Sequence, residues 1–363
     1  MKTWDLKYLI DKKNKLINRY CISRSENERY KISQMINTID DAIEYITPSV
    51  EESDYDILDS LDTDIEYYNN LCKPYLGDVT DLYTRFYFNL PKAPTPFQKI
   101  DTCKSKIITT THGLFEDVKK CFAYRLKSNE LNGNLRVRFE RSRVDDGFEA
   151  QTFPLYGTDV TLVSTNINKN IGDYFNLIHE YGHVLNHTFN KIQMFDYEKY
   201  ALQEVAPLFF ELVAGNYLEE IGLNKRDINK MLVHIFRDAV TGAGVDVFRT
   251  ELIKNRKRFE NENDVLDYLK NNFYDEVLIA FSADNPLSGN MHYVFSYIVA
   301  VELYMLYLKD PIDALNKLTR IMKINNLNAK QYYEFIEDLG IVPNLSMGEY
   351  LDSLKRKQNT YGR

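Results

Sequence analysis

The segment HEYGH, at residues 179–183, combines residue types that could hold a metal ion and activate water. If the segment is helical, His179 and His183 lie four residues apart, which places both imidazole rings on one face about 6 Å apart along the helix axis. Glu180 then lies about 100° around the helix, beside the ion rather than on it. A carboxylate in that place can accept a proton from zinc-bound water, whose pKa the ion lowers towards neutrality. The pattern therefore predicts a zinc site with Glu180 as the general base.

A catalytic zinc site needs a third protein ligand. A third histidine of the HExxHxxGxxH type is excluded, because Asn186 and Phe189 occupy its glycine and histidine positions. The segment QEVAPLFFE (203–211) instead offers Glu204 and Glu211, seven residues apart and on one face of a helix. An unpaired carboxylate is costly to bury in so apolar a run. We therefore expect one carboxylate on the metal and Glu211 bonded to a ligand histidine, with exposure of both to water as the alternative.

The segments around these residues predict a mainly helical protein with a helical, zincin-type catalytic domain. Apolar residues recur at helical spacing through residues 174–189, 201–223, 265–281 and 290–308. Between residues 135 and 166 the pattern changes to alternation and β-branched residues, which predicts a small β-sheet beside the active-site helix. We place a boundary near residue 130, with a helical N-terminal region at 1–130 and the zinc peptidase catalytic region at 131–363.

Composition narrows the classes of partner. The chain has 363 residues, of which 44% are apolar, enough to bury a substantial core. A net charge of -8 argues against nucleic-acid partners and against binding to an anionic membrane. The four cysteines form no CxxC pair. The amino terminus has no continuous apolar segment as long as that of a signal peptide, and no apolar segment is long enough to span a membrane. We expect a soluble, cytoplasmic protein without a disulfide framework.

The stretch from Thr161 to Leu218 resembles the thimet oligopeptidase and oligoendopeptidase F family of zinc peptidases. In that family a strand ending in Asn leads through a D-x-F-x-L segment into HExGH, and this chain has the same residues in that order: Asn166, Asp173, Phe175, Leu177, His179, Glu180, Gly182 and His183. The later pattern E-[VI]-A-x-x-x-x-E recurs as Glu204, Val205, Ala206 and Glu211. The resemblance implies one Zn²⁺ per chain, with Glu204 as its third ligand.

A tyrosine-rich helix near the carboxy terminus of family members is similar to HYVFSYIVA (292–300). The resemblance implies that Tyr297 and Tyr293, spaced i, i+4, donate hydrogen bonds to the oxyanion of the tetrahedral intermediate. Phe295 stands where a third tyrosine is often found. The family histidine that precedes this helix has no clear counterpart, and His292 is the candidate substitute. The alternative is an aromatic stripe that packs into the core.

The resemblance also implies a substrate and a place for it. A peptide would add to the strand at residues 160–166, taken as an edge strand, by backbone hydrogen bonds. The expected activity is that of a zinc metalloendopeptidase acting on oligopeptides. Because the chain is shorter than typical members, part of the helical wall around the substrate channel is expected to be missing. A processing protease for one peptide or protein, and a zinc-binding family member without turnover, are the alternatives.

Overall fold

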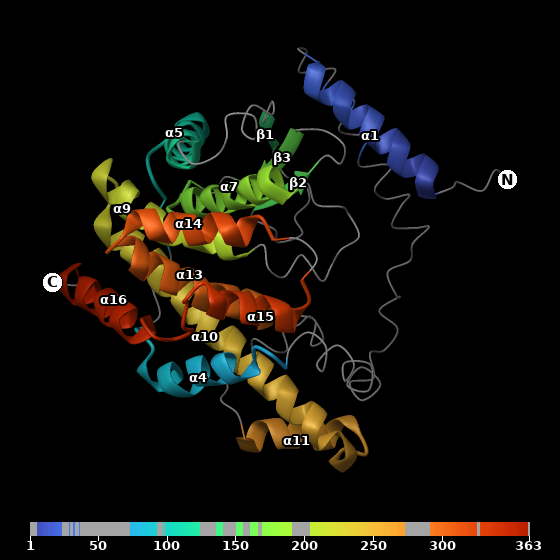
Figure 1. Ribbon diagram of the computed structural model, residues 1–363, viewed down its shortest axis with the longest axis vertical. Helices are drawn as coiled ribbons and strands as arrows, with labels where there is room; N and C mark the ends of the chain where they lie inside the picture. Colours follow the sequence, from blue (N-terminus) through green and yellow to red (C-terminus); the bar gives the residue numbers. More distant parts are fainter. Residues whose placement is uncertain are drawn as a thin grey trace.

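The structure, a computed structural model, describes residues 6–23, 29, 32, 36, 73–92, 97, 99–123, 136–140, 150–154, 160–165, 169–190, 204–272, 291–324 and 327–361. These residues are mainly helical, as predicted (Figure 1). The elements are, in chain order, α1 (Leu6–Ile22), α4 (Leu76–Phe86), η2 (Tyr87–Asn89), α5 (Lys104–Ala123), β1 (Arg136–Glu140), β2 (Ala150–Pro154), β3 (Val160–Thr165), α7 (Gly172–Asn190), α9 (Val205–Glu220), α10 (Lys225–Asn255), η3 (Arg256–Arg258), α11 (Glu262–Asn272), α13 (Met291–Tyr307), α14 (Pro311–Met322), α15 (Ala329–Asp338) and α16 (Met347–Tyr361).

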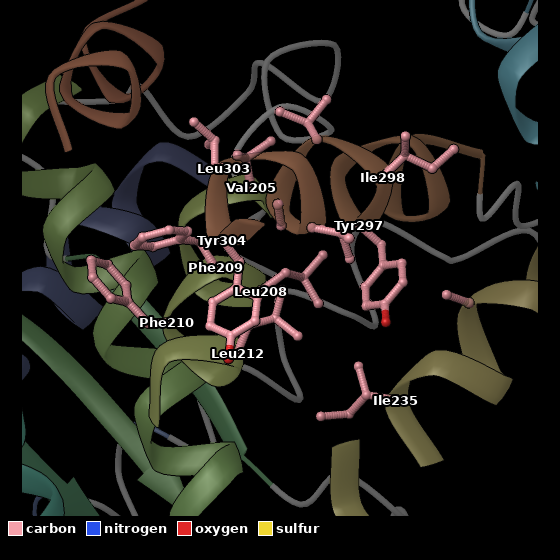
Figure 2. Close-up of a cluster of buried hydrophobic side chains, with 14 of the residues drawn as sticks. Val205, Leu208, Phe209, Phe210, Leu212, Ile235, Tyr297, Ile298, Leu303 and Tyr304 are labelled. Carbon is pink, nitrogen blue, oxygen red and sulfur yellow. The ribbon is translucent and has the colours of Figure 1, made fainter. Parts of the chain in front are cut away.

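Helices α9 and α13 are apolar on nearly every side because other helices surround them. Helix α9 packs against α7, α10, α13 and α14, and α13 also packs against α4, α14 and α16. Among the buried side chains labelled in Figure 2 are Val205, Leu208, Phe209, Phe210 and Leu212 from α9, Tyr297, Ile298, Leu303 and Tyr304 from α13, and Ile235 from α10. Each fully buried aliphatic or phenyl side chain stabilises the fold by about 1.5–3 kcal/mol. This packing fixes the position of α9.

Helix α7 lies between α5 and the strands on one side and α9 and α14 on the other (Figure 1). Its start is set by Asp173, whose buried carboxylate accepts a hydrogen bond from the Asn170 backbone N–H at 3.0 Å. An acidic side chain in the first turn also complements the helix dipole. Phe175 and Leu177 are fully buried. The D-x-F-x-L segment therefore anchors α7 in the core.

The three strands form one sheet in the order β1-β3-β2. Strand β3 pairs in parallel with β1 and antiparallel with β2, so it is the central strand. The prediction that the segment 160–166 is an edge strand open to a peptide is therefore wrong for the described residues 160–165, because β1 and β2 take up both of its sides. Asn166 lies outside the described residues. Strand β2 instead borders the sheet, next to α7.

Contacts also join the two regions on either side of residue 130. Helix α5 packs on α7, and α4 packs along α10 and α13. The described residues stop at 123 and resume at 136, so the boundary near residue 130 stays a prediction. Among the described helices, none combines the length and the apolar character needed to cross a membrane.

Candidate metal site

The site is formed where α7 crosses the start of α9, and the crossing is very close at Gly182. A Cβ atom at residue 182 would lie 2.4 Å from the Pro207 Cα and 2.5 Å from the Pro207 N, far inside van der Waals contact. Pro207 itself is tolerated because it lies in the first turn of α9, where a backbone N–H has no acceptor within the helix. A glycine on α7 and a proline on α9 thus let the two backbones approach.

This crossing brings Glu204 to the two histidines of α7. Glu204 immediately precedes α9 and its side chain does not cap the helix, so the carboxylate is available to the histidines. Its Oε2 lies 3.2 Å from His179 Nε2, and its Oε1 lies 3.5 Å from His183 Nε2. One ligand atom from each of the three residues lies within 4.8 Å of the others, and these three are a group that could bind a metal ion.

The separations between these atoms fit a shared cation. Four ligands in a tetrahedron with bonds of about 2.1 Å lie about 3.4 Å from one another, close to the observed 3.2 and 3.5 Å. Glu204 Oε2 is buried and makes no hydrogen bond in spite of the nearby imidazole. An orphaned carboxylate oxygen is costly inside a protein unless a cation or a donor satisfies it. The donor set therefore suits a metal ion.

Glu211, two turns along α9 from Glu204, binds the other nitrogen of His179. The distance from His179 Nδ1 to Glu211 Oε1 is 2.6 Å. The predicted hydrogen bond between Glu211 and one of the two histidines of HEYGH is thus confirmed, while the role of that histidine as a metal ligand stays a prediction. When Nδ1 carries the proton that it donates to Glu211, Nε2 is left with its lone pair directed at the shared site.

The charges of these residues act strongly on one another. Burial raises the pKa of Glu204, but the neighbouring His183 and His179 outweigh burial and lower that pKa to about 2. Burial lowers the pKa of His179, and its contacts with Glu204 and Glu211 outweigh burial, so the net pKa lies well above the ordinary value. Burial lowers the pKa of His183 and raises that of Glu211. Glu204 is therefore an anion that faces two imidazoles.

Glu180 is not part of the three-residue group. Its side chain is 6% exposed, and Thr152 of β2 donates a hydrogen bond from Oγ1 to its Oε2. Thr152 Oγ1 also lies 3.2 Å from the Glu180 backbone carbonyl oxygen. The sequence analysis missed Thr152, because a threonine 28 residues before Glu180 belongs to no motif and is brought there only by the packing of β2 on α7.

The three candidate residues of α13 occupy different surroundings. Tyr293 is half-buried. Its pKa lies well above the ordinary value, mainly because of burial and also because of the negative charges of Glu211 and Glu204. Tyr297 is fully buried, and its ring lies 6.5 Å from that of Phe236 in an edge-on arrangement. In Figure 2 its side chain extends from α13 towards α10.

His292 packs against a different part of the molecule. Its ring lies 5.6 Å from that of Tyr75, which precedes α4, in an edge-on arrangement. Burial lowers the pKa of His292 to about 4. Of the three α13 residues, Tyr293 is the one whose surroundings combine partial exposure with the influence of both site carboxylates.

No protein-family model matches the sequence, and no curated protein matches it in sequence either. Three solved structures align with the chain at low sequence identity. One is described as an oligoendopeptidase F, with 12% identity, a TM-score of 0.52, and coverage of 98% of this chain and 75% of that chain. A structure described as an oligoendopeptidase F from Bacillus anthracis str. Ames shares 12% identity at a TM-score of 0.48, over 96% of this chain and 69% of that one.

A third structure, described as PZ peptidase A with an inhibitor, also shares 12% identity at a TM-score of 0.48, over 98% of this chain and 76% of that one. At 12% identity, the similarity to the oligoendopeptidase F structure with a TM-score of 0.52 is evidence about the fold alone. The chain therefore has a fold similar to that of the oligoendopeptidase F structure.

Proposed function

We propose that this chain is a zinc-dependent metallopeptidase that hydrolyses oligopeptides, with His179, His183 and Glu204 as the metal ligands. The observation that carries the proposal is the convergence of these three ligand atoms within 4.8 Å. Two histidines and a carboxylate also suit other metals, and zinc is favoured because the HExxH spacing places a carboxylate beside the ion as a base. The similarity of fold to the oligoendopeptidase F structure supports a peptidase rather than another hydrolase.

Each residue of the site has a role in this mechanism. When bound, zinc would polarise the scissile carbonyl and lower the pKa of the attacking water towards neutrality. The Glu180 carboxylate accepts the proton of that water and then donates it to the leaving amine nitrogen. Glu211 holds the His179 ring in the orientation that directs Nε2 at the site. Tyr293 is the favoured donor to the oxyanion, since it is partly exposed and the charges of Glu211 and Glu204 both raise its pKa, which keeps the hydroxyl protonated.

A peptide substrate is proposed to lie along β2 rather than β3. Within the described part of the sheet, β2 pairs only with β3 and has its other side free of strand partners. An extended peptide can add to such a side through backbone hydrogen bonds. Strand β2 also touches Glu180 through Thr152. A peptide there would pass close to the proposed base.

The proposal is tested by metal analysis of protein purified without chelators, together with turnover of a panel of quenched fluorescent peptides. We expect about one zinc per chain and cleavage of several peptides. Glu180→Gln should keep its zinc and lose activity about 10²–10⁴-fold. Glu220→Gln, an exposed position at the end of α9, is the matched control and should keep both zinc and activity.

The outcomes separate the alternative functions. If the protein binds zinc but neither wild type nor variant cleaves any peptide, the proposed enzymatic activity is wrong and the protein is a zinc-binding protein without turnover. Absence of bound metal would overturn both. Cleavage confined to a single peptide of a broad panel would instead identify a processing protease.

A further inference from the structure

The Thr152 hydroxyl contacts both the side chain and the backbone of Glu180, the proposed general base. Oγ1 donates to Glu180 Oε2 and lies 3.2 Å from the Glu180 carbonyl oxygen. Thr152 is only 7% exposed, and β2, its strand, packs directly on α7. The contact therefore joins the sheet to Glu180, which lies between the two candidate metal-binding histidines and is not part of the metal-binding group.

The hydroxyl of Thr152 has one hydrogen to share between two acceptors. A charged carboxylate is a stronger acceptor than a peptide carbonyl, and hydrogen bonds to ionised groups are about twice as strong as neutral ones. The hydrogen is thus directed at Glu180 Oε2. Because this hydrogen bond stabilises the negative charge on Oε2, Oε1 is the more basic of the two oxygens and the better acceptor of a further proton.

We propose that Thr152 is a positioning residue: it holds Glu180 Oε2 so that Oε1 takes the proton from the attacking water. This role rests on the proposed function. A glutamate side chain has three rotatable bonds, and an ordered carboxylate avoids the loss of rotamer freedom on reaching the reactive geometry. A displacement of about 1 Å in a catalytic group can lower the rate about 10²-fold. The hydrogen bond from Thr152 would thus affect the reaction rate by positioning Glu180 and not by changing how the metal is held.

The test compares Thr152→Val, which keeps the shape and removes the hydroxyl, with Thr152→Ser, which restores the hydroxyl. In full-length, zinc-loaded protein we expect Thr152→Val to lower kcat about 10- to 100-fold, with KM and zinc content unchanged. Thr152→Ser should regain most of the lost kcat. In a Glu180→Gln background Thr152→Val should cause no further loss, because its effect passes through the Glu180 carboxylate.

The matched control is Thr250→Val. Thr250 is also buried, and its hydroxyl donates a hydrogen bond to the Asp246 carbonyl oxygen within α10 at 2.8 Å. Phe248 and Leu252, on either side of it in the chain, belong to a different core cluster from the residues around the site. Thr250→Val should leave kcat unchanged. If Thr152→Val keeps wild-type kcat, if Thr152→Ser is as impaired as Thr152→Val, or if Thr152→Val lowers kcat further in the Glu180→Gln background, the positioning role is overturned.

A second readout needs no turnover. In urea unfolding of the metal-free protein, Thr152→Val should lower the unfolding midpoint more in the wild-type background than in Glu180→Ala, because the lost bond exists only in the former. Equal shifts in both backgrounds would overturn the contact itself. Wild-type protein that binds zinc but cleaves no peptide would overturn the proposed function, whereas an active wild type with an unimpaired Thr152→Val would overturn only the role of Thr152.

Discussion

At the scale of single residues, His179 is held on both of its nitrogens by carboxylates. Glu211 binds Nδ1 at 2.6 Å and Glu204 lies 3.2 Å from Nε2. The first contact fixes the tautomer and the orientation of the ring, and the second places Nε2, the nitrogen proposed to bind zinc, beside an oxygen of the proposed third ligand. A carboxylate that never touches the ion can thus control how well the ion is held.

We therefore expect Glu211→Gln to weaken zinc binding about 10- to 100-fold, the cost typical of losing a carboxylate behind a ligand histidine. Competition against a chromogenic chelator would measure the affinity. Glu219→Gln is the matched control on the same helix: Glu219 pairs with Lys225 and Lys357, not with a histidine of the site. This variant should leave the affinity unchanged. An unaltered affinity in Glu211→Gln would contradict the role assigned to Glu211.

The two tyrosines of α13 should behave differently when the hydroxyl is removed. We expect Tyr293→Phe to lower kcat about 10²-fold or more, as loss of an oxyanion donor does. Tyr297→Phe should have the smaller effect on kcat, because Tyr297 is fully buried and packs against Phe236. Steady-state kinetics on one peptide would compare the variants, and a larger loss in Tyr297→Phe would reverse the assignment.

At the scale of elements, the site depends on the distance between α7 and α9. The proposed ligands come from α7 and from the residue that precedes α9, so their separation is set by how closely the backbones pack at Gly182 and Pro207. The apolar contacts of α9 with α13 hold α9 from the other side. A shift of α9 along or away from α7 would move Glu204 relative to both histidines.

Gly182→Ala should accordingly damage both folding and metal binding. The added methyl would lie 2.4 Å from a backbone atom that cannot move without displacing α9, and overpacking of this kind costs about 1–3 kcal/mol or more. Denaturant unfolding and zinc titration would measure the two effects. Gly113→Ala on α5 is the control, since its Cβ would meet only the Tyr217 hydroxyl at 3.9 Å and alanine favours a helix. A fully stable, zinc-binding Gly182→Ala would contradict the packing argument.

At the scale of the whole molecule, the metal would link α7, which packs against α5, to α9, which packs against α13 (Figure 1). A ligand that binds only the folded state stabilises it by mass action. Binding at this crossing would therefore stabilise the folded protein as a whole and not only the site.

Zinc should raise the thermal unfolding temperature. At a free concentration of 100 times Kd the gain is about 2.7 kcal/mol, which corresponds to a rise in Tm of a few degrees in a protein of this size. Thermal melts with zinc and with chelator would show the difference. His183→Ala, which removes one ligand, should melt at the same temperature under both conditions, and a zinc-dependent rise that persists in this variant would place the ion elsewhere.

The sequence by itself determined what is local to one helix. The spacing of His179, Glu180 and His183 fixes their relation on α7, and the seven-residue spacing of Glu204 and Glu211 places both on one side of α9, because a helix has a constant rise and turn per residue. The mainly helical character followed from the same periodicity. No pairing between distant segments was needed for either conclusion.

Only the tertiary structure decided which segments become neighbours. The β-branched residues at 160–165 indicate a strand but not its partners. Strands β1 and β2 pair with it on both sides, so the predicted edge position was wrong. The burial of Tyr297 and the hydrogen bond from Thr152 to Glu180 likewise depend on contacts between elements far apart in the chain. The periodicity of the sequence indicates which face of an element is apolar, but which element packs against that face depends on how the whole chain folds.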